Sequence, residues 1–215
     1  MSQGGSPLRP EHFQRQDEAD DALFYREPRL VTHIDDAAIA SASKFYGDLI
    51  APGSLVLDLM TSWVSHLPAG LQLAGVAGLG MNEVELAQNP VLTERVIQDL
   101  NRDPVLPWND ATFDAAIVTV SVQYLTRPDA VFREVGRVLK PGAPFAVTFS
   151  NRCFPTKAVA AWLSLNSRDQ AELIGLYFRL SDAFEAPQAF DLSPGAGHDP
   201  LFAVVATRKA ATLAS

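Results

Sequence analysis

The chain has 215 residues, 47% of them hydrophobic, and a formal net charge of −8. This length and composition are enough for one well-buried domain and short for two. The negative balance works against a general nucleic-acid surface, because phosphate neutralisation requires clustered Lys and Arg, and it favours a small molecule or a basic local patch of a protein as the substrate. The only cysteine, Cys153, allows no internal disulfide, and no apolar run is long enough to span a membrane. With no secretory leader in view, we expect a cytoplasmic protein.

The first 53 residues are predicted to form a tail and a helical cap. Residues 1–10 are rich in Gly, Ser, Pro and Gln, a composition typical of disorder. Residues 11–53 are predicted as one or two helices, with the clearest apolar pattern running from Ala37 to Ile50 and a Pro-Gly pair ending the segment. Residues 54–215 then form the main domain, and the whole chain is expected to be one structural unit.

Short apolar runs alternate with helical stretches after residue 53. This alternation predicts an α/β fold with a mostly parallel sheet, right-handed crossovers and helices on both faces. Two final runs, separated by a loop rich in Pro and Gly, predict an antiparallel hairpin at the edge of a seven-stranded Rossmann-like sheet. The predicted strands are 54–59, 71–79, 96–100, 113–120, 144–149, 183–192 and 201–208, and the predicted helices are 82–88, 128–139 and 157–179.

The stretch from Asp99 to Phe145 carries a specific order of features. An acid closes a strand, a Leu-Pro-Trp turn follows, the next strand opens with Phe-Asp, and an amphipathic helix ends at Lys-Pro-Gly before a further strand. That order resembles the second half of a class I S-adenosylmethionine-dependent methyltransferase of the small ubiquinone/menaquinone-type branch. The resemblance covers roughly Tyr46 to Arg208. It implies a domain that binds S-adenosyl-L-methionine and methylates a small molecule.

The candidate cofactor contacts follow the strands, because ligands of open α/β sheets lie beyond the carboxyl ends of the strands. The resemblance assigns Asp99 to the adenine amine, with Leu100 against the adenine face, and places Asp58 near the amino-acid end. From the residues alone, Asp99 can instead cap a turn at Asn101, and Asp58 can cap a turn over 62–67. The full set of candidates is Asp58, Met60, Ser62, Gly78, Gly80, Met81, Asn82, Asp99, Leu100 and Ser121.

Two loops depart from the family pattern. Where the family has a DLGCGTG-like turn, this chain reads Asp58-Leu59-Met60-Thr61-Ser62-Trp63-Val64. Its β-branched residues disfavour positive φ, so Ser62 has to replace a loop glycine, and Trp63 either covers the cofactor or fills its methionine site. The acid that holds the ribose in the family falls at Gly80, which leaves Asn82 or Glu83 as substitutes. These departures keep open a catalytically silent member of the fold with a binding or regulatory role.

Catalytic residues are not fixed by the sequence. Tyr124 and His66 are candidates for proton transfer, and the alternative for each is a structural role. His33 with its neighbouring acids lacks a third ligand, so no metal site is predicted, and Cys153 has no adjacent His to make it a nucleophile. The glycine spacing over 75–80 is a weak match to a dinucleotide loop, which makes a nicotinamide cofactor a minor alternative. The methyl acceptor and the oligomeric state are not predicted.

Overall fold

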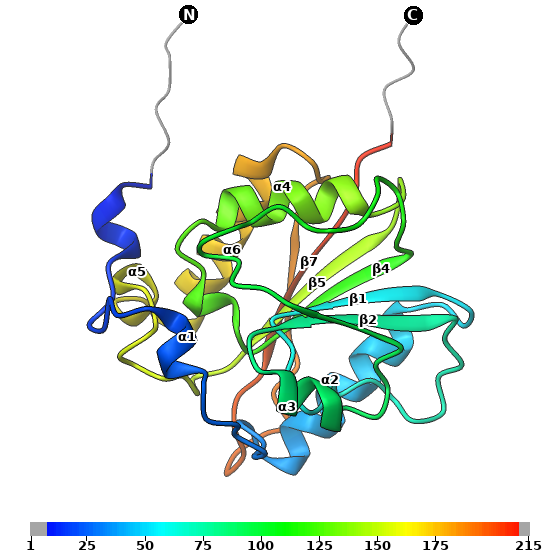
Figure 1. Cartoon of the computed structure of the whole chain (residues 1–215), viewed down its shortest axis with the longest axis horizontal. Helices are drawn as coiled ribbons and strands as arrows, with labels where there is room; N and C mark the ends of the chain where they lie inside the picture. Colours follow the sequence, from blue (N-terminus) through cyan, green and yellow to red (C-terminus); the bar gives the residue numbers. More distant parts are fainter. Residues whose placement is uncertain (1–7, 211–215) are drawn as a thin grey trace, which may run out of the picture.

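The computed structural model describes residues 8–210, in which seven strands make one sheet (Figure 1). The predicted disordered segment 1–10 lies mostly outside this range, and Pro10 begins the 3-10 helix η1 (Pro10–Phe13). Within the described residues, no helix is both long and apolar enough to cross a membrane. The strands are β1 (Leu55–Leu59), β2 (Gly75–Gly80), β3 (Glu94–Ile97), β4 (Ala115–Thr119), β5 (Pro144–Phe149), β6 (Gln188–Asp191) and β7 (Phe202–Thr207).

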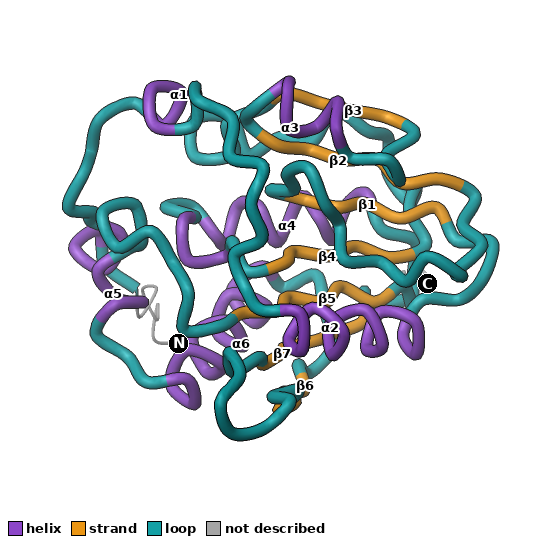
Figure 2. The backbone as a smooth tube through the Cα atoms, turned by 90° about the horizontal axis from the view of Figure 1, so that it is seen from below, coloured by secondary structure: helices purple, strands orange, loops and turns teal. Residues whose placement is uncertain are grey.

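The strand order is β3-β2-β1-β4-β5-β7-β6, which Figure 2 shows from one edge of the sheet to the other. β1 to β5 pair in parallel, whereas β7 pairs antiparallel with both β5 and β6. The predicted Rossmann-like sheet with an antiparallel C-terminal hairpin is confirmed. The chain order reverses between β1 and β4, and such a reversal opens a crevice at the carboxyl ends of the strands.

Helices cover the two faces of the sheet as separate layers (Figure 1). One face carries α2 (Asp36–Leu49) and α3 (Glu83–Gln88), and the other carries α4 (Pro128–Val138) and α6 (Ser167–Ser181). The predicted helices on both faces are therefore confirmed. The shorter helices are α1 (Asp21–Phe24), η2 (Val122–Tyr124) and α5 (Ala160–Leu163).

Helix α2 shows why these residues form this layer. The Asp35 side chain accepts a hydrogen bond from the Ala38 amide and caps the first turn. Ala38, Ala42 and Tyr46 then recur every four residues and are fully buried against the sheet. The Tyr46 hydroxyl lies 2.7 Å from the Thr119 hydroxyl at the end of β4, so α2 is also fixed to the edge where the strands end.

The predicted helix over 157–179 is wrong in its first half. The chain makes the four-residue helix α5 and then restarts as α6. Asn166 causes the break, because its side chain accepts a hydrogen bond from the Asp169 amide and caps a new helix. Gln170 closes the junction by donating to the Trp162 carbonyl at 3.1 Å.

Several predicted strand and turn boundaries also need correction. β2 begins at Gly75 rather than at residue 71, and β3 ends at Ile97, so Asp99 lies in the turn beyond the third strand. The predicted turn over 62–67 forms no helix, since residues 60–74 connect β1 to β2 without one. Asp58 therefore caps no helix and lies within β1, where it is fully buried.

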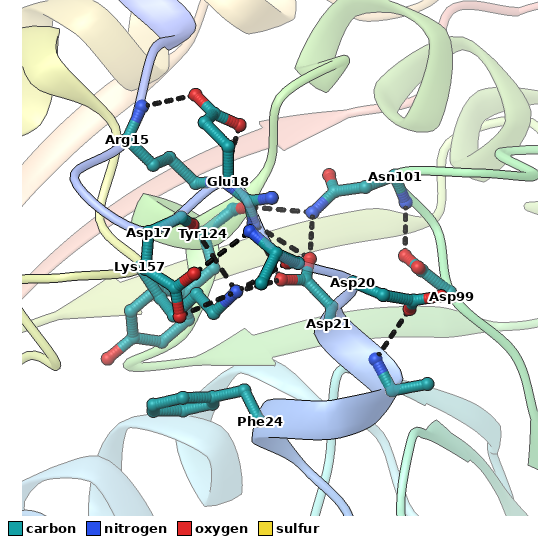
Figure 3. A network of polar contacts seen from close by, with 12 residues as sticks. Arg15, Asp17, Glu18, Asp20, Asp21, Phe24, Asp99, Asn101, Tyr124 and Lys157 are labelled. Atoms are coloured by element: carbon teal, nitrogen blue, oxygen red, sulfur yellow. Dashed lines mark hydrogen bonds and ion pairs between the residues drawn. The ribbon is translucent and has the colours of Figure 1, made fainter.

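Buried charges fasten the N-terminal segment, residues 8–35, to the domain (Figure 3). Lys157 is fully buried and pairs with Asp21 at 3.0 Å and Asp17 at 3.2 Å. Arg15 contacts both Asp21 oxygens, and the Asn101 amide donates to the same carboxylate at 3.0 Å. Burial alone would raise the pKa of Asp21, but the hydrogen bonds from these partners outweigh it and hold the pKa below its ordinary value.

Replacing Asp21 with Asn should destabilise the fold by about 3–5 kcal/mol, because it leaves two buried cations without their shared counterion. Urea denaturation measures the loss. Asp20→Asn is the matched control, since Asp20 pairs with Arg102 at the surface and Asn also caps helices well. That control should change stability by less than about 1 kcal/mol. Equal losses in both variants would contradict a stabilising role for the buried cluster.

Candidate functional site

One cavity lies beyond the carboxyl ends of β1, β2 and β4 and is walled by part of the N-terminal segment. Its volume is about 610 Å³, which suits a cofactor or a drug-sized ligand. Gly78 does not line it, because this glycine gives room to the Leu92 side chain instead. The predicted site residues that line the cavity are Asp58, Met60, Ser62, His66, Gly80, Met81, Asn82, Asp99, Leu100, Ser121 and Tyr124.

Buried polar atoms without partners gather on residues of this cavity. Within the described residues, no hydrogen bond reaches Arg29 Nη1, Asp58 Oδ2, His66 Nδ1 or Ser121 Oγ. A buried polar group left unpaired costs about 1–3 kcal/mol, so a fold rarely collects several in one place without a use. Their gathering indicates a site for a polar ligand.

Asp58 combines full burial with a strongly shifted pKa. Burial raises the pKa of this carboxyl to about 7, and hydrogen bonds from Ser65 and Thr61 hold the shift back. Near neutral pH the group is thus divided between its neutral and ionised forms. The neutral form can donate a hydrogen bond to a ligand, and the ionised form can pair with a positive charge. Acids whose pKa is shifted in this way are common at functional sites.

The β1 loop, residues 60–65, is held by bonds that replace the missing glycines. Met60 takes the left-handed conformation, with φ of 53°, so the predicted glycine substitute is Met60 rather than Ser62. The Ser62 hydroxyl instead donates to Glu85 at 2.6 Å. Asn89, fully buried, donates to the Ser62 carbonyl and to the Ser65 hydroxyl, both at 2.9 Å. Helix α3 and the residue after it therefore fix the loop over the sheet.

Gly80 is where the β1 loop touches the second strand. A Cβ at this position would lie well inside van der Waals distance of the Thr61 carbonyl oxygen, so no larger residue fits beside the loop as it stands. The predicted substitutes do not supply an acid. Asn82 uses its side-chain oxygen on the Glu85 amide and its nitrogen on the Tyr25 and Arg26 carbonyls, and Glu83 does not line the cavity.

Asp99 adopts the turn-forming alternative and also borders the cavity. Its Oδ1 accepts a hydrogen bond from the Asn101 amide at 2.9 Å. No other side-chain hydrogen bond of Asp99 occurs within residues 8–210, so Oδ2 is free to accept from a ligand. Leu100 beside it is buried and lines the same wall. The turn and a ligand contact are therefore compatible.

His66 is kept neutral by its surroundings. Burial, with a smaller effect from the nearby His33, lowers its pKa to about 4. Burial likewise lowers the pKa of His33, although Glu85 opposes that shift. A neutral imidazole at the cavity wall can accept a hydrogen bond from a bound hydroxyl or amine, and the buried Nδ1 of His66 has no other partner within the described residues. His33 lines the same cavity.

Tyr124 closes the wall of the cavity rather than presenting a free hydroxyl. Its oxygen accepts a hydrogen bond from the Phe154 amide at 2.8 Å, and its ring stacks on Phe154 with centroids 6.0 Å apart. Burial raises its pKa to about 12, so it stays protonated. Cys153 lines the same region, and burial raises the pKa of its thiol as well. Neither group is prepared as a strong nucleophile.

Two sequence readings fail at this site. The glycine-spaced run 75–80 is strand β2 itself rather than a turn, so it makes no phosphate-binding loop. The sequence did not reveal Arg29 as a residue of the cavity wall. Trp63, which was expected at the cofactor, does line the cavity, but its bond to the wall was not foreseen: the indole Nε1 donates to the Val31 carbonyl at 2.9 Å. A side chain-to-backbone bond of this kind leaves no periodic pattern that could have revealed it.

Known proteins resemble the chain over part of its length. A family model described as "Methyltransferase domain" matches residues 73–147. Methyltransferase GfsG of Streptomyces halstedii is 27% identical over 135 residues, which are 58% of this chain and 48% of that protein. The chain thus spans about half the length of this curated relative.

Solved structures share the fold. The [4+2]-cyclase SpnF superposes with a TM-score of 0.61 at 17% identity, covering 86% of this chain and 90% of that one. Haemonchus contortus phosphoethanolamine N-methyltransferase 2 in complex with S-adenosyl-L-methionine gives a TM-score of 0.57 at 12% identity, covering 80% of this chain and 52% of that one. At these identities the likeness is one of fold.

Gly80→Ala should destabilise the fold by about 1–3 kcal/mol, because the added methyl group collides with the backbone of Thr61 rather than with a movable side chain. Chemical denaturation measures this loss. Gly70→Ala is the matched control, since nothing lies within 4 Å of a Cβ added there. An unchanged Gly80→Ala protein would mean that the β1 loop is not packed on β2.

Asp58→Asn should change how stability depends on pH. The folded pKa of Asp58 is raised, so its stabilising contribution is complete below about pH 4 and is lost as pH rises towards 7. The asparagine side chain of the variant does not titrate. Between pH 4 and pH 8 the free energy of unfolding of the variant should therefore rise, relative to that of the wild type, by on the order of 4 kcal/mol. Denaturation at both pH values tests this, with the exposed Asp103→Asn as control. Parallel profiles for wild type and Asp58→Asn would rule out a neutral buried carboxyl.

Proposed function

We propose that the chain is a class I S-adenosylmethionine-dependent methyltransferase, which binds S-adenosyl-L-methionine and methylates a small molecule; the methyltransferase family model over residues 73–147 and the shared fold support this. The observation that carries this proposal is the cavity at the carboxyl ends of β1, β2 and β4, with unpaired polar atoms of Asp58 and Ser121 on its lining residues. The cavity volume of about 610 Å³ suits one cofactor with a small acceptor beside it.

The residues present fit the two ends of this cofactor. We assign Asp58 to the amino-acid end, and its burial and raised pKa support this, because such a carboxyl ionises against an ammonium group. Asp99 has a free oxygen for the adenine amine, and Leu100 offers an apolar face for the ring. Ser121 follows β4, the strand next to β1, so it supplies a hydroxyl on the side of Asp58 away from Asp99. The ribose is left without an acidic partner, so we expect modest affinity.

The chemistry asks little of the protein's own side chains. The cofactor's sulfonium, when bound, supplies an already activated methyl group. The N-terminal segment walls the cavity and excludes water, and the packed walls position the acceptor. The neutral His66, whose buried Nδ1 has no partner within the described residues, accepts a hydrogen bond from a hydroxyl or an amine of the acceptor and so orients it. With one cysteine in the chain, a reducing cytoplasmic setting is part of the proposal.

A second candidate is a member of the fold that binds a small molecule without methyl transfer. The Thr61 backbone over Gly80 favours it, since the loop occupies space beside the position of the family's ribose-binding acid. One solved structure of similar fold is that of a [4+2]-cyclase, SpnF, which supports other chemistry on this scaffold. A thermal shift separates the two candidates. Saturating S-adenosylhomocysteine should stabilise a binder by about 2.7 kcal/mol at a hundred times its Kd, and no shift at millimolar ligand favours the silent scaffold.

Asp99→Asn should weaken the binding of S-adenosylhomocysteine by about 1.5–3 kcal/mol, because a charge-assisted hydrogen bond to the adenine amine is lost. Isothermal titration calorimetry measures the change. Asp103→Asn is the control, since Asp103 caps the same turn through Val105 but does not line the cavity. An Asp99→Asn protein with wild-type affinity would limit Asp99 to its role in the turn.

A further inference from the structure

Arg29 differs from the other basic residue of the cavity because it has no carboxylate partner. Arg29 and Arg152 are the arginines that line the cavity. Arg152 pairs with Asp199 at 2.8 Å. Arg29 forms no ion pair within residues 8–210, and its buried Nη1 has no hydrogen-bond partner there either. The Arg29 side chain is half-buried, and a guanidinium group that buries a nitrogen with neither a counterion nor a hydrogen-bond partner is unusual, because such a group is costly unless it is paired.

The acid next to Arg29 does not neutralise its guanidinium group. Glu85 accepts from the backbone amide of Arg29 through Oε1 at 2.6 Å and from the Ser62 hydroxyl through Oε2 at 2.6 Å. Both of its oxygens are therefore engaged by other donors. Asp21, which also lines the cavity, already faces Arg15 and Lys157. The positive charge of Arg29 is left available to a ligand.

Aromatic rings surround this charge. The Arg29 guanidinium carbon lies 4.4 Å from the centre of the Phe24 ring and 5.3 Å from that of Phe154. Phe154 in turn contacts His33 edge to face and stacks with Tyr124. The Nη2 atom of Arg29 donates to the Phe24 carbonyl at 2.9 Å, and this bond fixes the Arg29 side chain in place. The group is thus preorganised among flat apolar surfaces, an arrangement that lowers the cost of binding.

We propose that Arg29 binds a carboxylate of the methyl acceptor, and that the acceptor is a small planar acid with an aromatic or conjugated body. This rests on the proposed function, because it names the acceptor of the same cavity. A guanidinium group matches a carboxylate with two parallel hydrogen bonds. Asp35 and Asp99 also line the cavity and disfavour a ligand with a second negative charge. The rings of Phe154 and Tyr124 suit a flat apolar body.

Ligand-observed NMR titration with benzoate and benzamide tests the proposal directly, since the two probes share a shape and differ in charge. The wild type should bind benzoate roughly tenfold more tightly than benzamide, the effect of a charge-assisted pair. Arg29→Gln should remove this preference, and Arg29→Lys should keep part of it. Arg152→Gln removes the same charge from the same cavity and should leave the preference intact. Thermal melts of all variants report on folding.

The outcomes separate this proposal from the proposed function. Equal binding of the two probes to the wild type, no binding of benzoate, or an Arg29→Gln protein that still prefers benzoate would each overturn the acceptor proposal. The wild-type comparison needs no variant and so stands even where a substitution unfolds the chain. Calorimetry with S-adenosylhomocysteine runs in parallel. Failure of that titration alone rejects cofactor binding and leaves the carboxylate site of Arg29 in place.

Discussion

The contact between the Thr61 backbone and Gly80 sets the shape of the candidate site. The β1 loop can lie on the second strand only because residue 80 has no side chain, and the Thr61 amide donates to the Leu79 carbonyl at 2.9 Å as it does so. Once the loop lies there, Asp58 is covered and loses water, which raises its pKa. The absence of a side chain at residue 80 and the absence of glycines from the β1 loop therefore belong to one packing arrangement, in which the loop lies on β2.

The wall opposite the sheet depends on bonds between side chains and backbone. Asn82 donates to the Tyr25 and Arg26 carbonyls, Glu85 accepts from the Arg29 amide, and the Trp63 indole donates to the Val31 carbonyl. An irregular chain can be held precisely in place when its backbone groups are satisfied in this way. The buried Lys157 cluster anchors the start of the same segment. The cavity is therefore closed by polar bonds rather than by a packed helix.

The sequence predicted what periodic burial controls and missed what single bonds control. Strands buried on both faces appear as continuous apolar runs, so the sheet and its edge hairpin could be predicted. Asn166 interrupts an otherwise helical pattern by capping a new helix, and no apolar spacing reveals that. Arg29 was missed for a similar reason, since its place depends on Glu85 and on rings distant in sequence. Asp99 was difficult because one side chain serves both a turn and the cavity wall.

The electrostatics of the cavity favour ligands that neutralise each other. Burial shifts the pKa of Asp58 and that of His66 towards their neutral forms, which indicates a surrounding of low polarity. In such a surrounding a sulfonium cation and a carboxylate are each costly alone and attract strongly together. Arg29 lies among aromatic rings and has no carboxylate partner within the described residues. In our proposal it is therefore the residue that would hold the carboxylate in this cavity.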